Sequence, residues 1–258
     1  MFGNPVVNSK KELIMKRYKP YIFCGYILVV IAIFSSCELS NDLEGSGHVT
    51  TKRYAVQNFE TLDVDGVLNV YLQPGDKYKA EVRTDDNLQN IVKIEQNGDV
   101  LKVYSNTDSD FEATEMNIYI TTPVVKEINL KGVTALYVKQ PLRQSSLTIH
   151  KENTGYMLLT GSFQYLSIDT DGVGDMDLEG KSENMMLVNN MIGDFKAYTF
   201  PVNYLTMIHN GTGTVEIKVL QKLDIEMNGV GDVYCKSYPP EVSKSGSGIG
   251  RLYMVDGD

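Results

Sequence analysis

Side chains that perform chemistry are scarce in this sequence, which has three histidines and three cysteines among 258 residues. The histidines at positions 48, 150 and 209 share no position in the repeat described below, so with Cys235 they form no plausible metal-binding set. Cys235 falls at an apolar position of that repeat, where we expect a small buried side chain and not a nucleophile. We therefore expect no cofactor, apart from the calcium alternative considered below.

Basic residues are scarce outside the first 36 residues. That segment holds five of the 24 Lys and Arg residues and one of the 33 Asp and Glu residues, so residues 37–258 carry a formal net charge of −13. Phosphate binding needs the opposite sign, which argues against a nucleic-acid partner. Anionic membrane surfaces are disfavoured for the same reason.

The apolar run at residues 21–34, YIFCGYILVVIAIF, is short for a membrane-spanning helix and suits the core of a signal peptide. It follows a basic start and ends in FSSC at 34–37, which resembles the lipobox of bacterial lipoproteins. We predict that residues 1–36 are a lipoprotein signal peptide and that Cys37 is lipidated. The protein would then be anchored by this lipid in the cell envelope, in the outer membrane of a Gram-negative bacterium. An uncleaved anchor is the alternative, and Met15 is an alternative start.

Processing at this site would remove Cys24 and attach lipid to Cys37, so Cys235 would have no partner for an intrachain disulfide. The stretch ELSNDLEGSG after Cys37 is polar and acidic. Residues 37–47 are therefore expected to form a solvated tether.

A repeat of close to 19 residues organises the rest of the chain. Its anchor glycines follow one another at steps of 19, 19, 20, 18 and 17 residues: Gly155, Gly174, Gly193, Gly213, Gly231 and Gly248. A second glycine precedes the anchor by two positions in several repeats: Gly172, Gly211 and Gly229. Apolar and polar residues alternate on both sides of this turn, which predicts two short strands in each repeat. The glycines are expected to give the backbone positive φ at a sharp corner in most coils.

Equivalent positions keep their character from one repeat to the next. An apolar column two positions past the anchor holds Val70, Leu136, Met157, Met176, Phe195, Val215 and Val233. The next, outward column holds Tyr71, Tyr137, Leu158, Asp177, Lys196, Glu216, Tyr234 and Arg251. An apolar column before the turn holds Leu62, Ile128, Ile149, Ile168, Leu187, Met207, Ile225 and Val242. Alternation within strands and stacking between repeats together predict a β-solenoid.

Polar side chains also recur at the corner. The position before the turn is an amide in three repeats, Asn190, Asn210 and Asn228, which predicts a hydrogen-bonded ladder along the axis. An acid directly follows the anchor glycine in three repeats: Asp175, Asp194 and Asp232. We expect these carboxylates to cap the turns, with calcium binding as the less favoured alternative because the spacing departs from calcium-binding nonapeptide repeats. A dinucleotide site is disfavoured because the third glycine and the following helix are absent.

The predicted fold is all-β, a right-handed parallel β-helix with an antiparallel N-terminal strand region. The domain is expected over residues 48–258, with regular coils over about 124–254 and an antiparallel insert over about 73–122. Within the insert, the Asn97-Gly98 pair between two alternating runs predicts a hairpin.

Three segments carry a family resemblance: GSGHVTTKRYAVQNFETLDVDGVLNVYLQPG, DGVGDMDLEG and SKSGSGIGRL. They resemble the head GIN domain of putative auto-transporter adhesins over residues 45–254. The resemblance implies a right-handed β-helical envelope lipoprotein and brings no catalytic residue. The sequence departs from the repeat at Asn153 and Met191, where a first glycine would stand.

The favoured function is a non-catalytic binding or adhesion module that engages a glycan or protein through one face of the solenoid. Two sets of residues are candidates for the ligand surface. One is the outward tyrosines Tyr71, Tyr137 and Tyr234, which suit sugar stacking. The other is an irregular polar set, in which a register shift by one residue would form a groove: Lys151, Thr170, Asn189 and His209.

A polysaccharide-active enzyme is the alternative. Many β-helical proteins cut acidic polysaccharides with acids and bases that converge on neighbouring coils. The outward run of Asp177, Lys196 and Glu216 could provide such groups, although alternating charges on a solvated face are the commoner cause of this pattern.

Overall fold

The computed structural model describes residues 43–106 and 110–256. The predicted signal peptide, Cys37 and the first part of the tether lie outside the described residues. Apart from a single 3-10 turn at Asp86–Leu88, the regular structure in the described ranges consists of strands. No helix in these ranges has the length and apolar character needed to span a membrane.

The strands of the N-terminal part are β1 (Leu43–Glu44), β2 (Val49–Tyr54), β3 (Thr61–Pro74), β4 (Lys79–Asp85), β5 (Val92–Asn97), β6 (Val100–Ser105), β7 (Phe111–Glu112) and β8 (Met116–Thr122). Those of the repeat are β9 (Glu127–Thr154), β10 (Met157–Val173), β11 (Met176–Ile192), β12 (Phe195–Lys196), β13 (Val202–His209), β14 (Val215–Ile217), β15 (Val219–Met227), β16 (Val233–Cys235), β17 (Glu241–Ser245) and β18 (Leu252–Met254).

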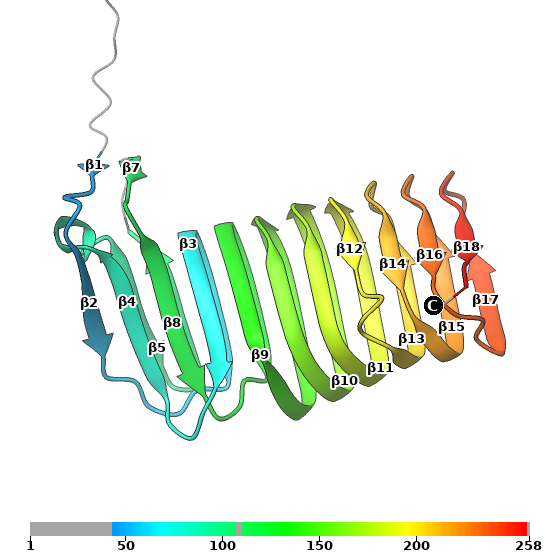
Figure 1. The fold of residues 1–258 in the computed structure, drawn as a ribbon, viewed down its shortest axis with the longest axis horizontal. Coiled ribbons are helices and arrows are strands. Elements are labelled where there is room, and N and C mark those ends of the chain that lie inside the picture. The colour runs from blue at the N-terminus through cyan, green and yellow to red at the C-terminus, as the bar shows by residue number, and fades with distance from the viewer. Residues whose placement is uncertain (1–42, 107–109, 257–258) are drawn as a thin grey trace, which may run out of the picture. The chain divides into compact units, whose positions relative to one another are not determined.

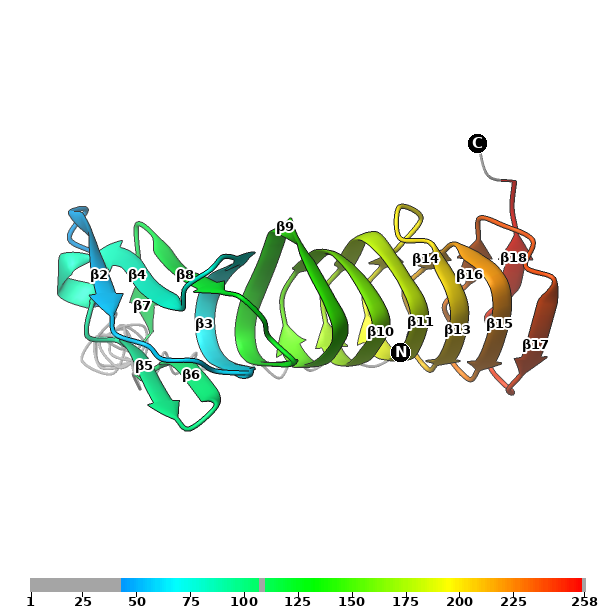
Figure 2. The same cartoon turned by 90° about the horizontal axis from the view of Figure 1, so that it is seen from below.

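The repeat folds as a stack of parallel coils, which confirms the predicted β-solenoid. Strand β9 pairs in parallel with β3 and β10, β10 pairs with β11, and β11 pairs with both β12 and β13. Two parallel series then continue along the stack, β12-β14-β16-β18 and β13-β15-β17. Strands β9, β10 and β11 run through a bend and contribute to both series (Figure 1; Figure 2). A stack of this kind buries one continuous core, because each coil covers the apolar side chains of its neighbours.

The predicted register is correct from the first coil to Cys235. Met157 pairs with Leu136 and Met176, and Phe195 pairs with Met176 and Val215. These side chains are fully buried, as the alternation predicted. Leu187 likewise lies between Ile168 and Met207 in the column before the turn.

The register predicted for the last coil is wrong by two residues. Val233 pairs with Leu252 and Tyr234 with Tyr253, so Tyr253 takes the outward position assigned to Arg251. Val242 pairs with Leu223 and is 45% exposed, whereas Lys244 lies beside Ile225. The anchor is Gly250 and not Gly248, because a Cβ at Gly250 would collide with the carbonyl oxygen of Gly231. A slip of two residues keeps every side chain on its face, so alternation alone did not detect it.

The corner glycines serve two purposes. In Gly172, Gly174 and Gly193 the backbone has positive φ, as expected. The glycines of the later corners are required by close packing of successive coils, because a Cβ on any of them would collide with a backbone oxygen of the preceding coil: Gly211, Gly213, Gly229 and Gly231. These four glycines do not adopt the positive φ that was predicted for most coils.

Aspartates cap the turns from one coil to the next. Asp175 Oδ1 accepts a hydrogen bond from the backbone N–H of Asp194 at 2.8 Å, and Asp194 Oδ1 accepts one from Thr214 at 3.0 Å. Asp232 Oδ1 accepts the N–H of Arg251 at 2.8 Å. Each carboxylate thus bonds the equivalent turn of the following coil, which confirms the predicted capping role.

The asparagine ladder is also present. Asn210 Nδ2 donates to Asn190 Oδ1 at 2.6 Å, and Asn228 Nδ2 donates to Asn210 Oδ1 at 3.2 Å. Both bonds lie in exposed surroundings, so the ladder borders the corner on the outside of the core.

The N-terminal region combines antiparallel and parallel pairing. Strand β4 pairs antiparallel with β2 and β8, and the predicted hairpin joins β5 and β6 with Gly98 at φ +61°. Strands β6 and β8 nevertheless pair in parallel with the two halves of β3. The ordered domain begins before residue 48, because the Ser46 hydroxyl donates to Asp86 at 2.6 Å and the Gly47 N–H to Asp85 at 2.8 Å. Ser46 and Gly47, which were predicted to belong to the tether, therefore contact the domain.

Candidate functional site

The outward column after the turn begins with a stack of three tyrosines, here called the tyrosine row: Tyr119, Tyr71 and Tyr137. They lie on β8, β3 and β9, whose register places the three residues side by side. The ring centroids of Tyr71 and Tyr119 are 5.1 Å apart, and those of Tyr71 and Tyr137 are 5.0 Å apart. The interplanar angles of 18° and 17° make both pairs nearly parallel.

Stacking changes what these tyrosines can offer a ligand. Tyr71 has a ring on each side, so its faces are covered and it presents a ring edge and a hydroxyl to solvent. Burial of the ring, together with the neighbouring tyrosines, raises the pKa of Tyr71 and keeps its hydroxyl protonated. Sugar stacking on the ring face, as expected from the sequence, is blocked at Tyr71. The row instead presents a line of hydroxyl groups.

A lysine adds positive charge to the tyrosine row. Lys139 Nζ lies 5.8 Å from the ring centroid of Tyr71 and 5.6 Å from that of Tyr137, within the range of cation–π attraction. On the other side of Tyr137, the ring of Tyr156 lies 5.8 Å away and its hydroxyl donates to Asp177 Oδ2 at 2.6 Å. Burial and this carboxylate raise the pKa of Tyr156.

Tyr234 does not join this row. The Leu158, Asp177, Lys196 and Glu216 positions separate it from Tyr137, and it stacks on Tyr253 with ring centroids 5.0 Å apart. The sequence pattern therefore missed two tyrosines, Tyr119 and Tyr253. The structure divides the predicted tyrosine surface into two clusters at opposite ends of the column.

In the charged middle of this column, Lys196 and Asp177 interact with residues outside the column. Lys196 Nζ lies 3.9 Å from a carboxylate oxygen of Asp175 and 3.9 Å from one of Asp194. Asp177 accepts the Tyr156 hydroxyl. The side chains of Lys196, Asp175 and Asp194 remain 43–47% exposed, so this is a solvated row of alternating charge.

The polar set Lys151, Thr170, Asn189 and His209, here called the polar column, lies inside the solenoid. All four residues are at most 1% exposed. Asn189 pairs with both Thr170 and His209, so there is no register shift. The prediction that these residues form a surface groove is wrong, because their inward positions are retained and their polar atoms bond within the core.

Hydrogen bonds connect three members of the polar column. Thr170 Oγ1 lies 3.3 Å from Asn189 Oδ1, and Asn189 Nδ2 lies 3.3 Å from His209 Nδ1. His209 Nε2 lies 3.1 Å from the carbonyl oxygen of Gly231, which can only accept, so Nε2 donates and the neutral Nδ1 accepts from Asn189. Burial lowers the pKa of His209 and favours this neutral ring.

Lys151 has a poorer environment. Its Nζ lies 3.4 Å from the backbone oxygen of Asn153, and burial lowers its pKa to about 8. Asn153 in turn donates to the Thr134 carbonyl at 2.6 Å, while its own Oδ1 is buried without a partner among the described residues. The pKa of this amine is therefore close to neutral pH, although the side chain is enclosed in the core.

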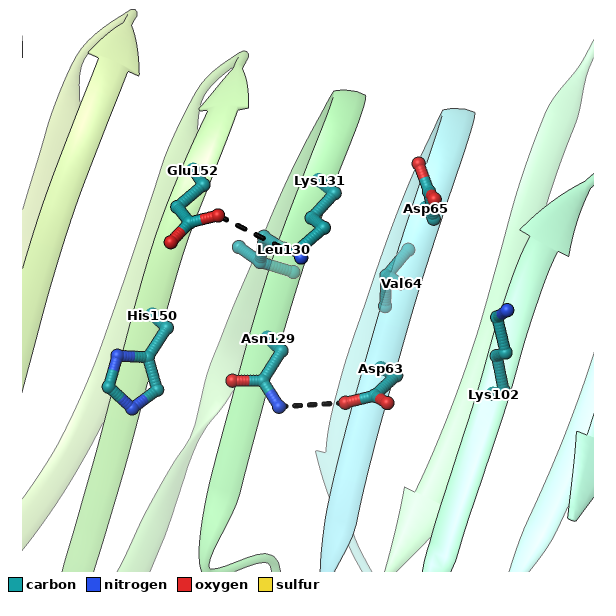
Figure 3. A pocket seen from close by; sticks show the side chains of 9 residues that line it. All are labelled: Asp63, Val64, Asp65, Lys102, Asn129, Leu130, Lys131, His150 and Glu152. Carbon is teal, nitrogen blue, oxygen red and sulfur yellow. Dashed lines mark hydrogen bonds and ion pairs between the residues drawn. The ribbon is translucent and has the colours of Figure 1, made fainter. Parts of the chain in front are cut away.

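A hollow of about 330 Å³ lies on the outer face of β3, β6 and β9, next to the segments that precede the glycine turn (Figure 3). Asn129 Nδ2 donates to Asp63 Oδ1 at 2.7 Å across it, and Lys131 Nζ lies 3.8 Å from Glu152 Oε2. His150 and Lys102 lie at its two sides. The hollow was not predicted from the sequence, although its polar lining residues occupy outward positions of the strand before the turn.

Cys235 and His48 lie outside the tyrosine row, the polar column and the hollow. Cys235 is a buried free thiol, as expected, and His48 is an exposed residue 3.2 Å from Asp86. Within residues 43–106 and 110–256, no three His, Cys, Asp or Glu side chains are grouped so that they could hold a metal ion.

Comparison with known proteins gives a family and a fold. The family described as "Putative auto-transporter adhesin, head GIN domain" matches residues 58–239. A crystal structure of a putative adhesin from Bacteroides fragilis is 24% identical, with a TM-score of 0.79, and the match covers 83% of this chain and 100% of that one. One from Parabacteroides distasonis is 20% identical, with a TM-score of 0.63 and coverage of 83% and 100%. A comparison with curated proteins found no match.

Proposed function

Because the chain belongs to the family of putative auto-transporter adhesins with the head GIN domain, we propose that it is a non-catalytic adhesion module that binds a glycan along the tyrosine row. In this proposal Cys37 carries the lipid that holds the domain in the cell envelope. The family relation supports an adhesion-type module at the cell envelope or surface. The ligand class and the anchor are our inference from the residues.

The observation that carries the glycan proposal is the regular spacing of the tyrosine row. Neighbouring strands repeat at about 4.8 Å, so Tyr119, Tyr71 and Tyr137 present hydroxyls at nearly constant intervals along the axis. A linear polysaccharide also repeats its hydroxyls at regular intervals, and would lie parallel to this row. Tyrosine hydroxyls both donate and accept hydrogen bonds, which suits sugar hydroxyl groups. Lys139 would favour a glycan with acidic substituents.

The arrangement of charges favours binding over catalysis. An enzyme of this kind needs an acid and a base that converge on one bond, with free protons to exchange. Here Asp177 accepts a tyrosine hydroxyl, and Lys196 lies between two carboxylates that already cap turns. In the hollow of Figure 3, Asp63 and Glu152 are each engaged by a neighbour.

The test is a glycan panel probed with the purified fragment 38–258, comparing neutral and acidic polysaccharides. The most informative variant is Tyr137→Phe, which keeps the ring stack and removes one hydroxyl. We expect it to weaken binding several-fold, because a hydrogen bond contributes about 0.5–1.5 kcal/mol. Tyr71→Ala should weaken binding by about tenfold or more, corresponding to about 1.4 kcal/mol.

The matched control is Tyr165→Ala. Tyr165 is 61% exposed and lies on β10 in the other parallel series, away from the tyrosine row. Equal losses for Tyr165→Ala and Tyr71→Ala, or glycan binding that neither tyrosine-row variant alters, would refute the proposed surface.

A further inference from the structure

An exposed apolar ridge runs along the glycine corner of the solenoid. The residue at the tip of the corner is β-branched in every coil, and these residues, here called the turn ridge, are Val67, Val133, Thr154, Val173, Ile192, Thr212, Val230 and Ile249. The six aliphatic members are between 45% and 77% exposed. The two threonines are exposed as well. Packing in the core therefore does not explain why aliphatic side chains occupy this position.

The members of the turn ridge stack directly on one another. Val67 pairs with Val133, and Val173 pairs with both Thr154 and Ile192. Backbone bonds continue the stack, since the Thr212 N–H donates to the Met191 carbonyl at 3.1 Å and the Val230 N–H to that of Gly211 at 3.1 Å. The ridge is thus continuous from the first coil to the last.

Polar rows border the turn ridge on both sides. The asparagine ladder precedes it in each of the middle coils, and the capping aspartates follow it. A contiguous exposed apolar surface with a polar border is characteristic of a protein or membrane contact. Because the ridge extends along the whole stack, an extended surface matches it better than a small molecule does.

The path of the chain favours the membrane. β1 pairs with β7, and Leu43 lies beside Phe111. Phe111 in turn lines a surface hollow together with Val67 and Val133, the first two members of the turn ridge. Figure 1 shows β1 and β7 at the edge where the arrowheads of β9, β10 and β11 end, which is the glycine corner. The described chain therefore begins beside the turn ridge.

The short tether restricts the orientation of the domain. Cys37 precedes Leu43 by six residues, which reach at most about 20 Å when fully extended. A lipid on Cys37 would hold this edge of the domain close to the bilayer. A second copy of the chain could also cover the turn ridge, but charge repulsion opposes this. Both copies would bring a net charge of −13 and a row of aspartates to the contact. The same negative charge disfavours an anionic bilayer.

We propose that the turn ridge lies on the surface of a zwitterionic lipid bilayer, with its aliphatic side chains among the headgroups. This inference rests on the lipid anchor of the proposed function. The domain would lie along the membrane on its glycine corner, and the tyrosine row would run parallel to the turn ridge, with Tyr71 and Tyr137 four residues past Val67 and Val133. The anchor and the ridge would together fix which face of the solenoid a glycan can reach.

The test places the domain on phosphatidylcholine vesicles without using cellular lipidation. The mature chain 37–258, whose compact unit begins at Asp42, is coupled through the Cys37 thiol to a maleimide lipid, while Cys235 stays buried. A genetically encoded environment-sensitive fluorescent amino acid replaces Ile192, which is 59% exposed. The control carries it at Tyr165, which is 61% exposed and distant from the corner. We expect a shift to shorter emission wavelength at position 192 and none at 165.

A second variant separates ridge contact from proximity alone. Val173→Thr and Val230→Thr are combined with the probe at 192, and threonine already occupies this corner position at Thr154 and Thr212, so the fold should be kept. This variant should lose most of the shift. Equal emission at 192 and 165 on vesicles would overturn the proposal, as would a shift at 192 without vesicles in a chain that sediments as a dimer. Because coupling is chemical, failure of Cys37 lipidation in cells leaves this result interpretable.

Discussion

The buried amine of Lys151 should make the stability of the protein depend on pH in a defined window. Its side chain is fully buried, its nearest acceptor is a backbone oxygen at 3.4 Å, and burial lowers its pKa from 10.5 to about 8. In the unfolded chain the pKa returns to its ordinary value. Between pH 8 and 10.5 the unfolded state therefore binds more protons than the folded state, and stability rises with pH. The cost of burying the charge is present below pH 8 and is relieved as pH rises through this window.

The size of the effect follows from the same shift. Each unit of pKa corresponds to about 1.4 kcal/mol, so the free energy of unfolding should rise by about 3 kcal/mol between pH 7 and 10.5 because of Lys151. Lys151→Met keeps a similar volume and removes the charge, so it should be more stable than the wild type at pH 7. Its advantage should shrink by about 3 kcal/mol at pH 10.5.

Urea denaturation of the two proteins at several pH values between 7 and 10.5 measures this difference. The ionisable groups other than Lys151 are common to both proteins, so their contributions cancel in the comparison. His209 does not interfere, because burial lowers its pKa and its transition falls on the acid side. A stability difference between wild type and Lys151→Met that stays constant over this range would refute the assignment of a buried, destabilised amine.

Three further predictions concern the register, the ladder and the anchor. Phe195→Ala removes a fully buried ring and should cost about 3–5 kcal/mol in the free energy of unfolding. Lys196→Ala should cost less than about 1 kcal/mol, because its ion pairs are exposed; equal losses in urea titrations would contradict the register. Asn210→Ala interrupts an exposed ladder and should cost about 0.5–1.5 kcal/mol by the same measurement, so a loss as large as that of Phe195→Ala would place the ladder in the core. Cys37→Ser should release the protein from the membrane fraction of cells or stall its processing, and a variant that fractionates like wild type would exclude the lipid anchor.

The solenoid and its inward columns could be predicted from the sequence because alternation and a fixed period act together. Met176 and Phe195 are one repeat apart, apolar at the same position, and paired in the structure. The last coil could not be predicted in this way. Gly246, Gly248 and Gly250 alternate there, so a shift of two residues fits the same pattern, and the carbonyl that Gly250 must approach decides between the two.

The surfaces were harder to predict than the core, because they join residues that are distant in the sequence. Tyr119 completes the tyrosine row from outside the regular repeat, through the pairing of β8 with β3. The polar column illustrates the opposite difficulty. A polar residue at an inward position looks like a register error until its partner is known, and the partner of Asn189 is a histidine on the next coil.

We propose that the protein binds a glycan along the tyrosine row. NMR chemical-shift mapping of the isotope-labelled fragment 38–258, titrated with the best-binding polysaccharide of the panel, tests this most directly. We expect the largest changes in residues 69–73, 117–121 and 135–139, which carry Tyr71, Tyr119 and Tyr137 on paired strands. Changes confined to the hollow around Asp63 and Asn129 would contradict it.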